Sequence, residues 1–434
     1  MARKTIGCKE GKRTYNHTLA AGAAVILLII IGAVSYANFG TSWPTFAAGK
    51  TYYVDAANGN DSNNDGMSLG APFKTVKKAL SVAIRGATVN IRGGAYRESN
   101  LYPKAGVTIQ GYGTESTTLW DSSRSVFVVE NVDTVTFRNF TIADTSAKGI
   151  LVKNSGNIHI VGMTFQNVKE GAIHCENSWG MAILYNTITN SPPLVSNHGA
   201  IMLVWPRGGW RSIWDNIYDN TITGRSVGIA YMSDSEHSGG EGGEVTLSIS
   251  NNKITVGRMG IQITGTPLNI KTVYVRKNII TYDPNTYTGY FDFDSAGVLL
   301  ETGAGMTATI ENNTITGDFY YGLKPWNDLS NLYKYLLVRG NTIGIAQTAP
   351  RPNYAIRCVR IGLGDTITKI HANKLYGDNG IVLSYEDVEK LSDPRKNLSI
   401  LTNVIEVSSG QQAIQDDWGQ GDKWDPPKNR IIYR

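Results

Sequence analysis

The chain has 434 residues, including 47 glycines, with 18% charged residues and a net charge of +5. A charge excess this small makes no case for nucleic-acid binding. The abundance of Gly, Asn and Thr, with few long Leu/Ala/Glu/Lys patterns, favours an all-β solenoid over several helical domains.

The N-terminal tail is typical of an export signal. A basic stretch precedes an apolar run from Leu19 to Val34, and a small-x-small sequence, Ser35-Tyr36-Ala37, follows it. The run, of about sixteen residues, is almost long enough to span a bilayer, so residues 1–37 form either a cleaved signal peptide or a membrane anchor. Residues 38–50 read as a linker, and we expect the rest of the chain to be secreted or displayed at the cell surface.

Residues 51–125 are expected to form an N-terminal cap and the first coils. The segment NGNDSNNDG, residues 58–66, matches only the first half of a calcium-binding loop, because Pro72 stands where a closing Glu is required. Its Asn, Asp, Ser and Gly residues favour a turn-rich connector. A helix is predicted over Phe73–Ile84, with one apolar face suited to covering the open end of a core, made of Phe73, Val76, Leu80 and Ile84.

Residues 126–415 are expected to form the solenoid itself, because two short signatures recur at irregular intervals. Each signature reads as a short strand that buries its apolar side only by stacking on its neighbours. The first is a small residue followed by a branched aliphatic, at Gly149-Ile150, Ala172-Ile173, Ala200-Ile201, Gly228-Ile229, Gly260-Ile261, Gly297-Val298, Gly322-Leu323, Ala355-Ile356, Gly380-Ile381 and Ala413-Ile414. The second is Asn-x-Ile or Asn-x-Leu, beginning at Asn186, Asn220, Asn252, Asn278, Asn313, Asn341, Asn373 and Asn403.

Such a stack is a parallel β-helix. The recurring asparagines are expected to take left-handed φ at the bends and to bond amide to amide along the stack. Cys175 and Cys358 fall at the same inward position in coils six steps apart, roughly 29 Å at ~4.8 Å per step, so we expect reduced thiols in the core. Asp215 and Asp219 are expected to be turn residues, with metal binding as the alternative.

The run YYVDAANGNDSNNDGMSLGAPFKTVKKALSVAIRGATVNIRGGAYRE, residues 52–98, resembles the N-terminal signature of the pectate-lyase-like, right-handed parallel β-helix superfamily. The resemblance implies a right-handed, single-stranded β-helix of about ten to twelve coils with an N-terminal capping helix that protects a raw β edge. The paired-Asp and His-Gly signatures of polygalacturonases and the Trp-x-Asp-His run of pectate lyases are absent. Asp283-Pro284 also lacks the His-Asp ending of alginate epimerases, so the resemblance singles out no reaction.

The outward positions that follow the small-plus-branched pairs form one surface, where Trp residues and mixed charge suit a polysaccharide. Lys324 and Arg357 are candidate bases for β-elimination. His174 and Glu176 form either a proton-transfer pair or a structural hydrogen bond. The full set of catalytic candidates is Lys324, Arg357, His174, Glu176, Glu301, Asp234, Glu236 and His237; the substrate-binding candidates are Trp205, Arg207, Trp210, Gln262, Trp326 and Asp328.

The loop Ser233–Glu244 is either a metal or acid–base site, through Asp234, Glu236 and Glu241, or a solvated Gly-rich loop. Calcium is the candidate cofactor, a polysaccharide is the expected partner, and the membrane is a partner only through an uncleaved N-terminal segment. We expect a monomer that binds no nucleic acid. Residues 416–434, with Trp418 and Trp424, are expected to form a C-terminal cap or tail.

The leading hypothesis is therefore an exported polysaccharide lyase that acts on an acidic, uronate-containing polymer. A glycoside hydrolase on the same fold is one alternative, and it requires two carboxylates that face each other across a groove. A non-catalytic glycan-binding or structural cell-surface protein is the other alternative. The candidate carboxylates for a hydrolase are Glu176, Asp234, Glu236, Glu301 and Asp328.

Overall fold

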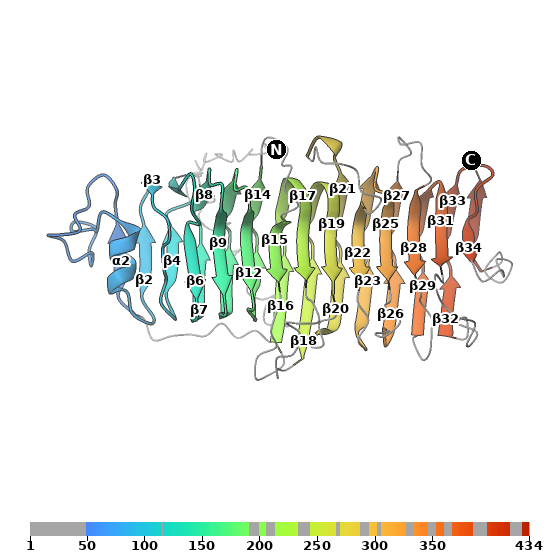
Figure 1. Cartoon of the computed structure of the whole chain (residues 1–434), viewed down its shortest axis with the longest axis horizontal. Coiled ribbons are helices and arrows are strands. Elements are labelled where there is room, and N and C mark those ends of the chain that lie inside the picture. Colours follow the sequence, from blue (N-terminus) through green and yellow to red (C-terminus); the bar gives the residue numbers. More distant parts are fainter. Residues whose placement is uncertain are drawn as a thin grey trace, which may run out of the picture. The chain divides into compact units, whose positions relative to one another are not determined.

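The chain winds into stacked coils whose strands all pair in parallel with their counterparts in neighbouring coils (Figure 1). The predicted export segment lies outside the described residues, and no helix in the described part of the chain is long and apolar enough to span a membrane. The computed structural model describes residues 49–114, 116–190, 199–204, 213–232, 244–265, 270–286, 295–301, 305–326, 333–345, 353–359, 367–384, 397–416 and 428–433.

Three walls of strands enclose the core. Wall 1 is a sheet of 13 strands: β1 (Thr51–Val54), β2 (Thr88–Ile91), β4 (Thr108–Gly111), β7 (Asp133–Arg138), β10 (Gly156–Val161), β13 (Ala182–Leu184), β16 (Ile213–Tyr218), β18 (Val245–Ser250), β20 (Ile270–Arg276), β23 (Thr307–Glu311), β26 (Tyr335–Arg339), β29 (Ile367–His371) and β32 (Leu398–Leu401). The predicted solenoid is thus confirmed in the described residues, with a coil number just above the expected range.

Walls 2 and 3 belong to one 22-stranded sheet, joined where β17 and β19 run through both walls without a break. Wall 2 contains β3 (Gly94–Arg97), β5 (Thr117–Trp120), β8 (Thr141–Ala143), β11 (Thr164–Gln166), β14 (Thr187–Thr189), β17 (Thr221–Met232), β19 (Lys253–Thr264), β21 (Ile279–Tyr282), β24 (Thr314–Gly317), β27 (Thr342–Ile345), β30 (Lys374–Gly377), β33 (Val404–Val407) and β35 (Arg430–Tyr433). Wall 3 contains β6 (Phe127–Glu130), β9 (Lys148–Lys153), β12 (Gly171–Glu176), β15 (Gly199–Val204), the second halves of β17 and β19, β22 (Ala296–Glu301), β25 (Tyr321–Trp326), β28 (Tyr354–Val359), β31 (Asn379–Ser384) and β34 (Ile414–Asp416).

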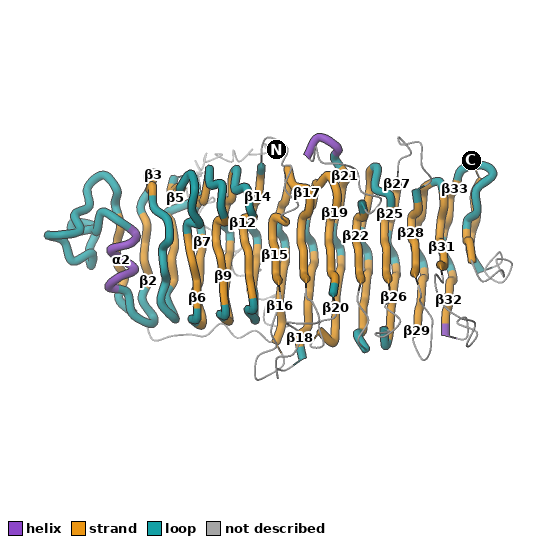
Figure 2. The backbone as a smooth tube through the Cα atoms, viewed as in Figure 1, coloured by secondary structure: helices purple, strands orange, loops and turns teal. Residues whose placement is uncertain are grey.

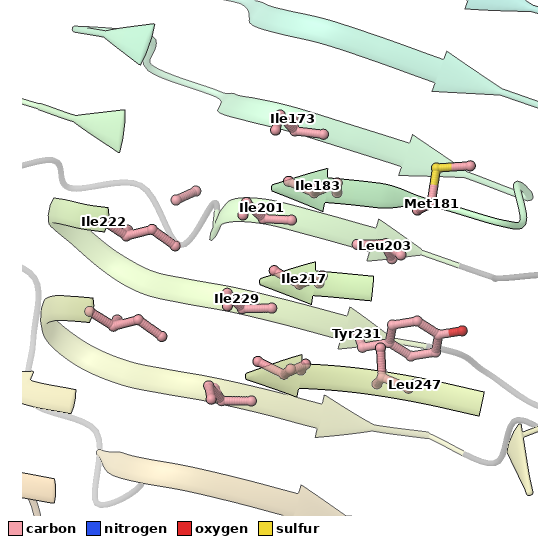
Figure 3. Close-up of a cluster of buried hydrophobic side chains, with 14 of the residues drawn as sticks. Ile173, Met181, Ile183, Ile201, Leu203, Ile217, Ile222, Ile229, Tyr231 and Leu247 are labelled. Carbon is pink, nitrogen blue, oxygen red and sulfur yellow. The ribbon is translucent and has the colours of Figure 1, made fainter. Parts of the chain in front are cut away.

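The small-plus-branched pairs form the core side of wall 3. The branched residue of each pair is buried and lies in register with the next, and Figure 3 shows Ile173, Ile201 and Ile229 in this arrangement. The small residue is needed because the next coil approaches closely. A Cβ at Gly260, for example, would lie 2.4 Å from the Gly297 carbonyl oxygen, which no real side chain tolerates. The predicted repeat is therefore confirmed, together with its physical reason.

The predicted asparagine ladder runs between walls 1 and 2. Each amide donates to the Oδ1 of the next asparagine at 2.9–3.0 Å, from Asn186 through to Asn429. The left-handed φ expected at these residues is wrong, because the bend is made one position earlier. Aligned with the ladder, the residues at positive φ are Tyr185, Asp219, Asn251, Lys277, Asn312, Gly340, Ala372 and Thr402. This bend turns the following asparagine inward, where its amide meets those of its neighbours.

The N-terminal cap is built around helix α2 (Val76–Val82), shorter than the predicted Phe73–Ile84. Thr75 caps the helix, and Glu98 accepts hydrogen bonds from the first-turn amides of Val76 and Lys77, both at 2.8 Å. The helix ends because Ala83 is extended, so Ile84 points outward at 60% exposure and does not join the apolar face. Figure 2 shows α2 at the end of the stack, where it covers the first coil.

The NGNDSNNDG segment is the connector between β1 and this helix. Asp61 accepts hydrogen bonds from the backbone N–H groups of Lys74 and Thr75 at 2.7 and 3.1 Å, and from the Thr75 hydroxyl at 2.7 Å. Asp65 accepts one from the Met67 amide at 2.9 Å. The carboxylates of this segment therefore hold the turn and the helix start. At the other end of the chain, β35 extends wall 2 by pairing with β33.

Among the described residues, the solenoid core contains two free, buried thiols and the buried carboxyl group of Asp215. Cys175 and Cys358 are confirmed as free, buried cysteines. Asp215 is not a turn residue, because it points inward from β16 and is 1% exposed. It accepts hydrogen bonds from the Met181 N–H at 2.8 Å and the Tyr231 hydroxyl at 3.0 Å. Figure 3 shows Met181 and Tyr231 among the isoleucines of this part of the core. Asp219, by contrast, lies at a bend as predicted.

We expect Asp215→Asn to stabilise the protein at neutral pH. Burial raises the pKa of Asp215 from 3.8 to about 6, against the hydrogen bonds that it accepts. The protonated Asp215 therefore contributes its full stabilisation below the ordinary pKa of 3.8. This stabilisation is lost as the pH rises through about 6. The asparagine oxygen can accept from the Met181 N–H while its NH2 donates to the Tyr231 hydroxyl oxygen, and the side chain cannot ionise. From pH 4 to pH 8 the free energy of unfolding of the variant should rise by on the order of 2–3 kcal/mol relative to that of the wild type. Urea unfolding at several pH values measures this difference, and parallel pH curves would contradict it.

Candidate functional site

The candidate site residues in the described part of the chain lie on the outer face of wall 3. The outward positions form one file in consecutive strands, confirmed by the strand register. This file contains Leu151, His174, Met202, Ala230, Gln262, Leu299 and Lys324, followed by Arg357 and Val382. A parallel file moved by two positions contains Glu301 beside Trp326. Position along the solenoid therefore decides which of these side chains can meet.

Lys324 and Arg357 meet in a cluster of aromatic rings, here named the cation–tyrosine cluster and made of Tyr321, Lys324, Trp326, Tyr354 and Arg357. The Lys324 amine lies 4.6 Å from the ring centroid of Tyr321 and 4.7 Å from that of Trp326. Arg357 donates a hydrogen bond to the Tyr321 hydroxyl at 2.8 Å. Its guanidinium lies 5.6 and 5.8 Å from the Tyr321 and Tyr354 rings. Two cations on adjacent strands are thus held in place by ring faces.

The local backbone explains this arrangement. Strand alternation places Lys324 and Trp326 on the outer face and Pro325 between them toward the core. The buried Tyr333 hydroxyl donates to the carbonyl of Leu300, the register partner of Pro325, at 2.8 Å. Lys324 itself is 6% exposed, an unusual burial for a lysine on an outer face.

His174 and Glu176 form a separate cluster. The His174 Nε2 lies 3.0 Å from one Glu176 oxygen, and the Lys153 amine lies 3.3 Å from the other. This cluster is on β9 and β12, five strand steps from β25, or about 24 Å at ~4.8 Å per step. The structure therefore divides the described candidates into two groups that cannot act on the same bond.

The outer face between the two clusters is apolar. A second hydrophobic cluster, distinct from the core, lies there and includes Tyr321. Gln262 faces outward within this stretch, half-buried. The cluster consists of Val227, Ala230, Met259, Ala296, Leu299 and Tyr321, with Met202, Met232, Tyr320 and Tyr354 packed against it. Apolar side chains therefore occupy most of the described outward positions between the two clusters.

The remaining candidates cannot be placed. Asp234, Glu236, His237, Glu241, Trp205, Arg207, Trp210 and Asp328 lie outside the described residues. In the described ranges no group of three or more His, Cys, Asp or Glu side chains could hold a metal ion. Calcium therefore stays a prediction for the loop at Ser233–Glu244, and no step of the chemistry below depends on it.

Sequence reasoning missed the tyrosines of the cluster. Tyr321 and Tyr354 directly precede the pairs Gly322-Leu323 and Ala355-Ile356, so they are the outward positions on the other side of each pair. Their rings are stacked, with centroids 5.8 Å apart. Counting outward positions in both directions from each pair would have found them.

Comparisons with known proteins agree with this architecture. The family model described as "Right handed beta helix region" matches residues 115–343, more than half of the chain. The structure of the Streptococcus pneumoniae surface protein and adhesin PfbA is similar at 12% identity and a TM-score of 0.52, over 82% of this chain and 94% of that one.

Two enzyme structures show weaker similarity. A Family 28 exopolygalacturonase from Yersinia enterocolitica has 10% identity and a TM-score of 0.48, over 86% of this chain and 78% of that one. Pectate lyase Pel9A has 13% identity and a TM-score of 0.40, over the same two shares. At such identities the likeness concerns the fold alone, and no curated protein sequence gives a significant match. The matched family model and the parallel, three-walled solenoid together establish that the chain belongs to the right-handed β-helix family.

Proposed function

We propose that the protein is an extracytoplasmic polysaccharide lyase that cleaves an acidic, uronate-containing polymer at the cation–tyrosine cluster. The observation that carries this proposal is the placement of Lys324 and Arg357 on adjacent strands between the rings of Tyr321, Tyr354 and Trp326. Aromatic faces suit sugar rings, and two neighbouring cations suit a carboxylate. The export-type N-terminal sequence supports a location outside the cytoplasm.

The chemistry requires a base and a group that neutralises the uronate carboxylate. In the proposed reaction Arg357 binds the carboxylate, which favours loss of the proton from the adjacent carbon. Lys324 takes that proton as the general base. The electron pair left on carbon forms a C=C bond as the glycosidic C–O bond breaks, and the leaving oxygen takes up a proton. The Tyr321 hydroxyl, bonded to Arg357, fixes the direction of the guanidinium.

The geometry favours a lyase over a hydrolase among the described residues. Glu176 and Glu301, the two described carboxylates of the hydrolase hypothesis, lie on β12 and β22, four strand steps apart. At ~4.8 Å per step this is about 19 Å, whereas a glycoside hydrolase needs carboxyl groups roughly 5–9.5 Å apart. These two residues cannot share a glycosidic bond.

Incubation with a panel of uronate polymers tests the proposal. We expect at least one polymer to yield unsaturated products, detected by the ultraviolet absorbance of the new double bond, in assays with and without added calcium. New reducing ends without this absorbance would indicate a hydrolase. Binding of a polymer without any cleavage would indicate a glycan-binding surface protein. Either result would overturn the lyase assignment.

A further inference from the structure

A strongly cationic patch lies on the outer side of wall 1, away from the cation–tyrosine cluster. Four neighbouring strands, β20, β23, β26 and β29, with the residues at their ends, contribute it. In their described residues (270–278, 305–313, 333–341 and 367–373) six Lys or Arg side chains accompany one carboxylate, that of Glu311. The cations are Lys271, Arg276, Lys277, Lys334, Arg339 and Lys369. We name these residues, with Glu311, Tyr274 and Tyr335, the wall 1 patch.

Contacts within the patch hold several cations in place. The Arg276 guanidinium lies 3.9 Å from the ring centroid of Tyr274, and the Lys369 amine lies 5.7 Å from that of Tyr335. Glu311 bridges Arg276, at 3.4 Å, and Arg339 on the opposite neighbouring strand. One carboxylate thus serves two guanidinium groups. The patch keeps a large positive excess, although like charges on strands ~4.8 Å apart repel one another and so destabilise the folded chain.

The exposed cations define how a partner would reach the patch. Lys277 and Lys334 are exposed, and so is Arg339 at the end of β26. They lie on the coils of β20 and β26, and Lys277 and Lys334 stand at opposite ends of these two strands. A repeating polyanion laid across these coils would contact several cations at once, whereas a small anion would use only one or two. The charge pattern therefore fits a polymer.

We propose that the wall 1 patch is a second, non-catalytic binding surface for an acidic polysaccharide. Two tyrosine rings beside the cations add the mixture of ring faces and charge that suits acidic sugars. The patch belongs to wall 1 and the cation–tyrosine cluster to wall 3, so one polymer chain can be held at the patch while another is cleaved. The choice of an acidic polysaccharide as the ligand rests on the proposed function. The location of the binding surface rests on the charges of the patch.

Binding of polygalacturonate to the full chain at low and high salt tests this inference. All proteins carry Lys324→Met, which keeps the polymer intact. The patch variant K277E/K334E should bind about tenfold more weakly at low salt, with a shallower salt dependence. K277Q/K334Q should show an intermediate loss. The matched control K74E/K169E makes the same change in net charge at two exposed lysines outside the patch, and should bind within about twofold of the parent.

Thermal unfolding first confirms that each variant is folded. Equal losses in the patch and control variants would show a non-specific effect of net charge and would overturn the inference. Binding of double-stranded DNA that is tighter than polygalacturonate binding, and lost in the patch variant, would assign the patch to nucleic acid and overturn it as well. Absence of unsaturated products in the wild type would refute the lyase proposal alone, because binding at the patch is measured without cleavage.

Discussion

Replacement of Lys324 by methionine should lower kcat/KM for β-elimination by about 10³-fold, within the range measured for the loss of a general base. Methionine keeps an unbranched apolar side chain between the rings of Tyr321 and Trp326, which lie 4.6 and 4.7 Å from the lysine amine. The fold and the ring contacts should therefore persist while the proton acceptor is lost. The initial rate of double-bond formation on the best polymer of the panel measures the effect.

His174→Gln is the matched control for this variant. His174 is on the same outward file as Lys324 but five strand steps away, so its removal should leave kcat/KM within about twofold. Arg357→Gln should weaken binding of the substrate carboxylate. We therefore expect a large fall in kcat/KM on the charged polymer and a smaller fall on its methyl ester. If His174→Gln abolished turnover and Lys324→Met did not, the chemistry would belong to the cluster of His174, Glu176 and Lys153.

The architecture was predictable because its constraints repeat in every coil. Where one coil approaches the next, as at Gly260, a small residue is required, and the following branched residue must face the core. The asparagine of each coil meets the same amide partner above and below. Signatures of this kind are visible in a single sequence because the chain meets the same packing problem at each turn.

The site was only partly predictable, because its geometry depends on distance along the solenoid and on longer contacts. Counting outward from each pair found Lys324 and Arg357, and the register confirmed their shared file. The same count placed His174 in that file too, but strand spacing separates it from Lys324 by about 24 Å. The apolar cluster between them has no local signature, since its members are ordinary strand residues such as Val227 and Met259.

Asp215 shows how local turn chemistry can mislead. The segment Asp-Asn-Ile-Tyr-Asp-Asn, residues 215–220, resembles turn composition at both ends, and Asp219 does lie at a bend. Strand alternation nevertheless turns Asp215 into the core, where the Tyr231 hydroxyl and the Met181 amide satisfy its two oxygens. A partner from a different wall decided the outcome, and short-range sequence patterns carry no information about it.

The asparagine ladder allows the sharpest test of what holds the coils together. Asn312 and Asn313 are adjacent and chemically identical, but only Asn313 belongs to the ladder. Its side chain donates to the Val275 carbonyl at 2.9 Å and to Asn341 at 2.9 Å, and it accepts from the backbone and side-chain amides of Asn278 at 2.9 and 3.0 Å. At 1% exposure, no water can replace these bonds.

Asn313→Ala should therefore lower the free energy of unfolding by about 3 kcal/mol or more, because it removes four buried hydrogen bonds to three neighbouring residues and leaves the Asn278 backbone N–H without its acceptor. Asn312→Ala should cost only about 1 kcal/mol, since Asn312 is exposed and loses just the ease with which asparagine adopts its φ of 57°. Urea unfolding of the two variants measures the difference. Equal losses would mean that the bend, and not the ladder, supplies the stability of each corner. The ratio of the two effects thus separates hydrogen bonding along the stack from backbone conformation within a coil.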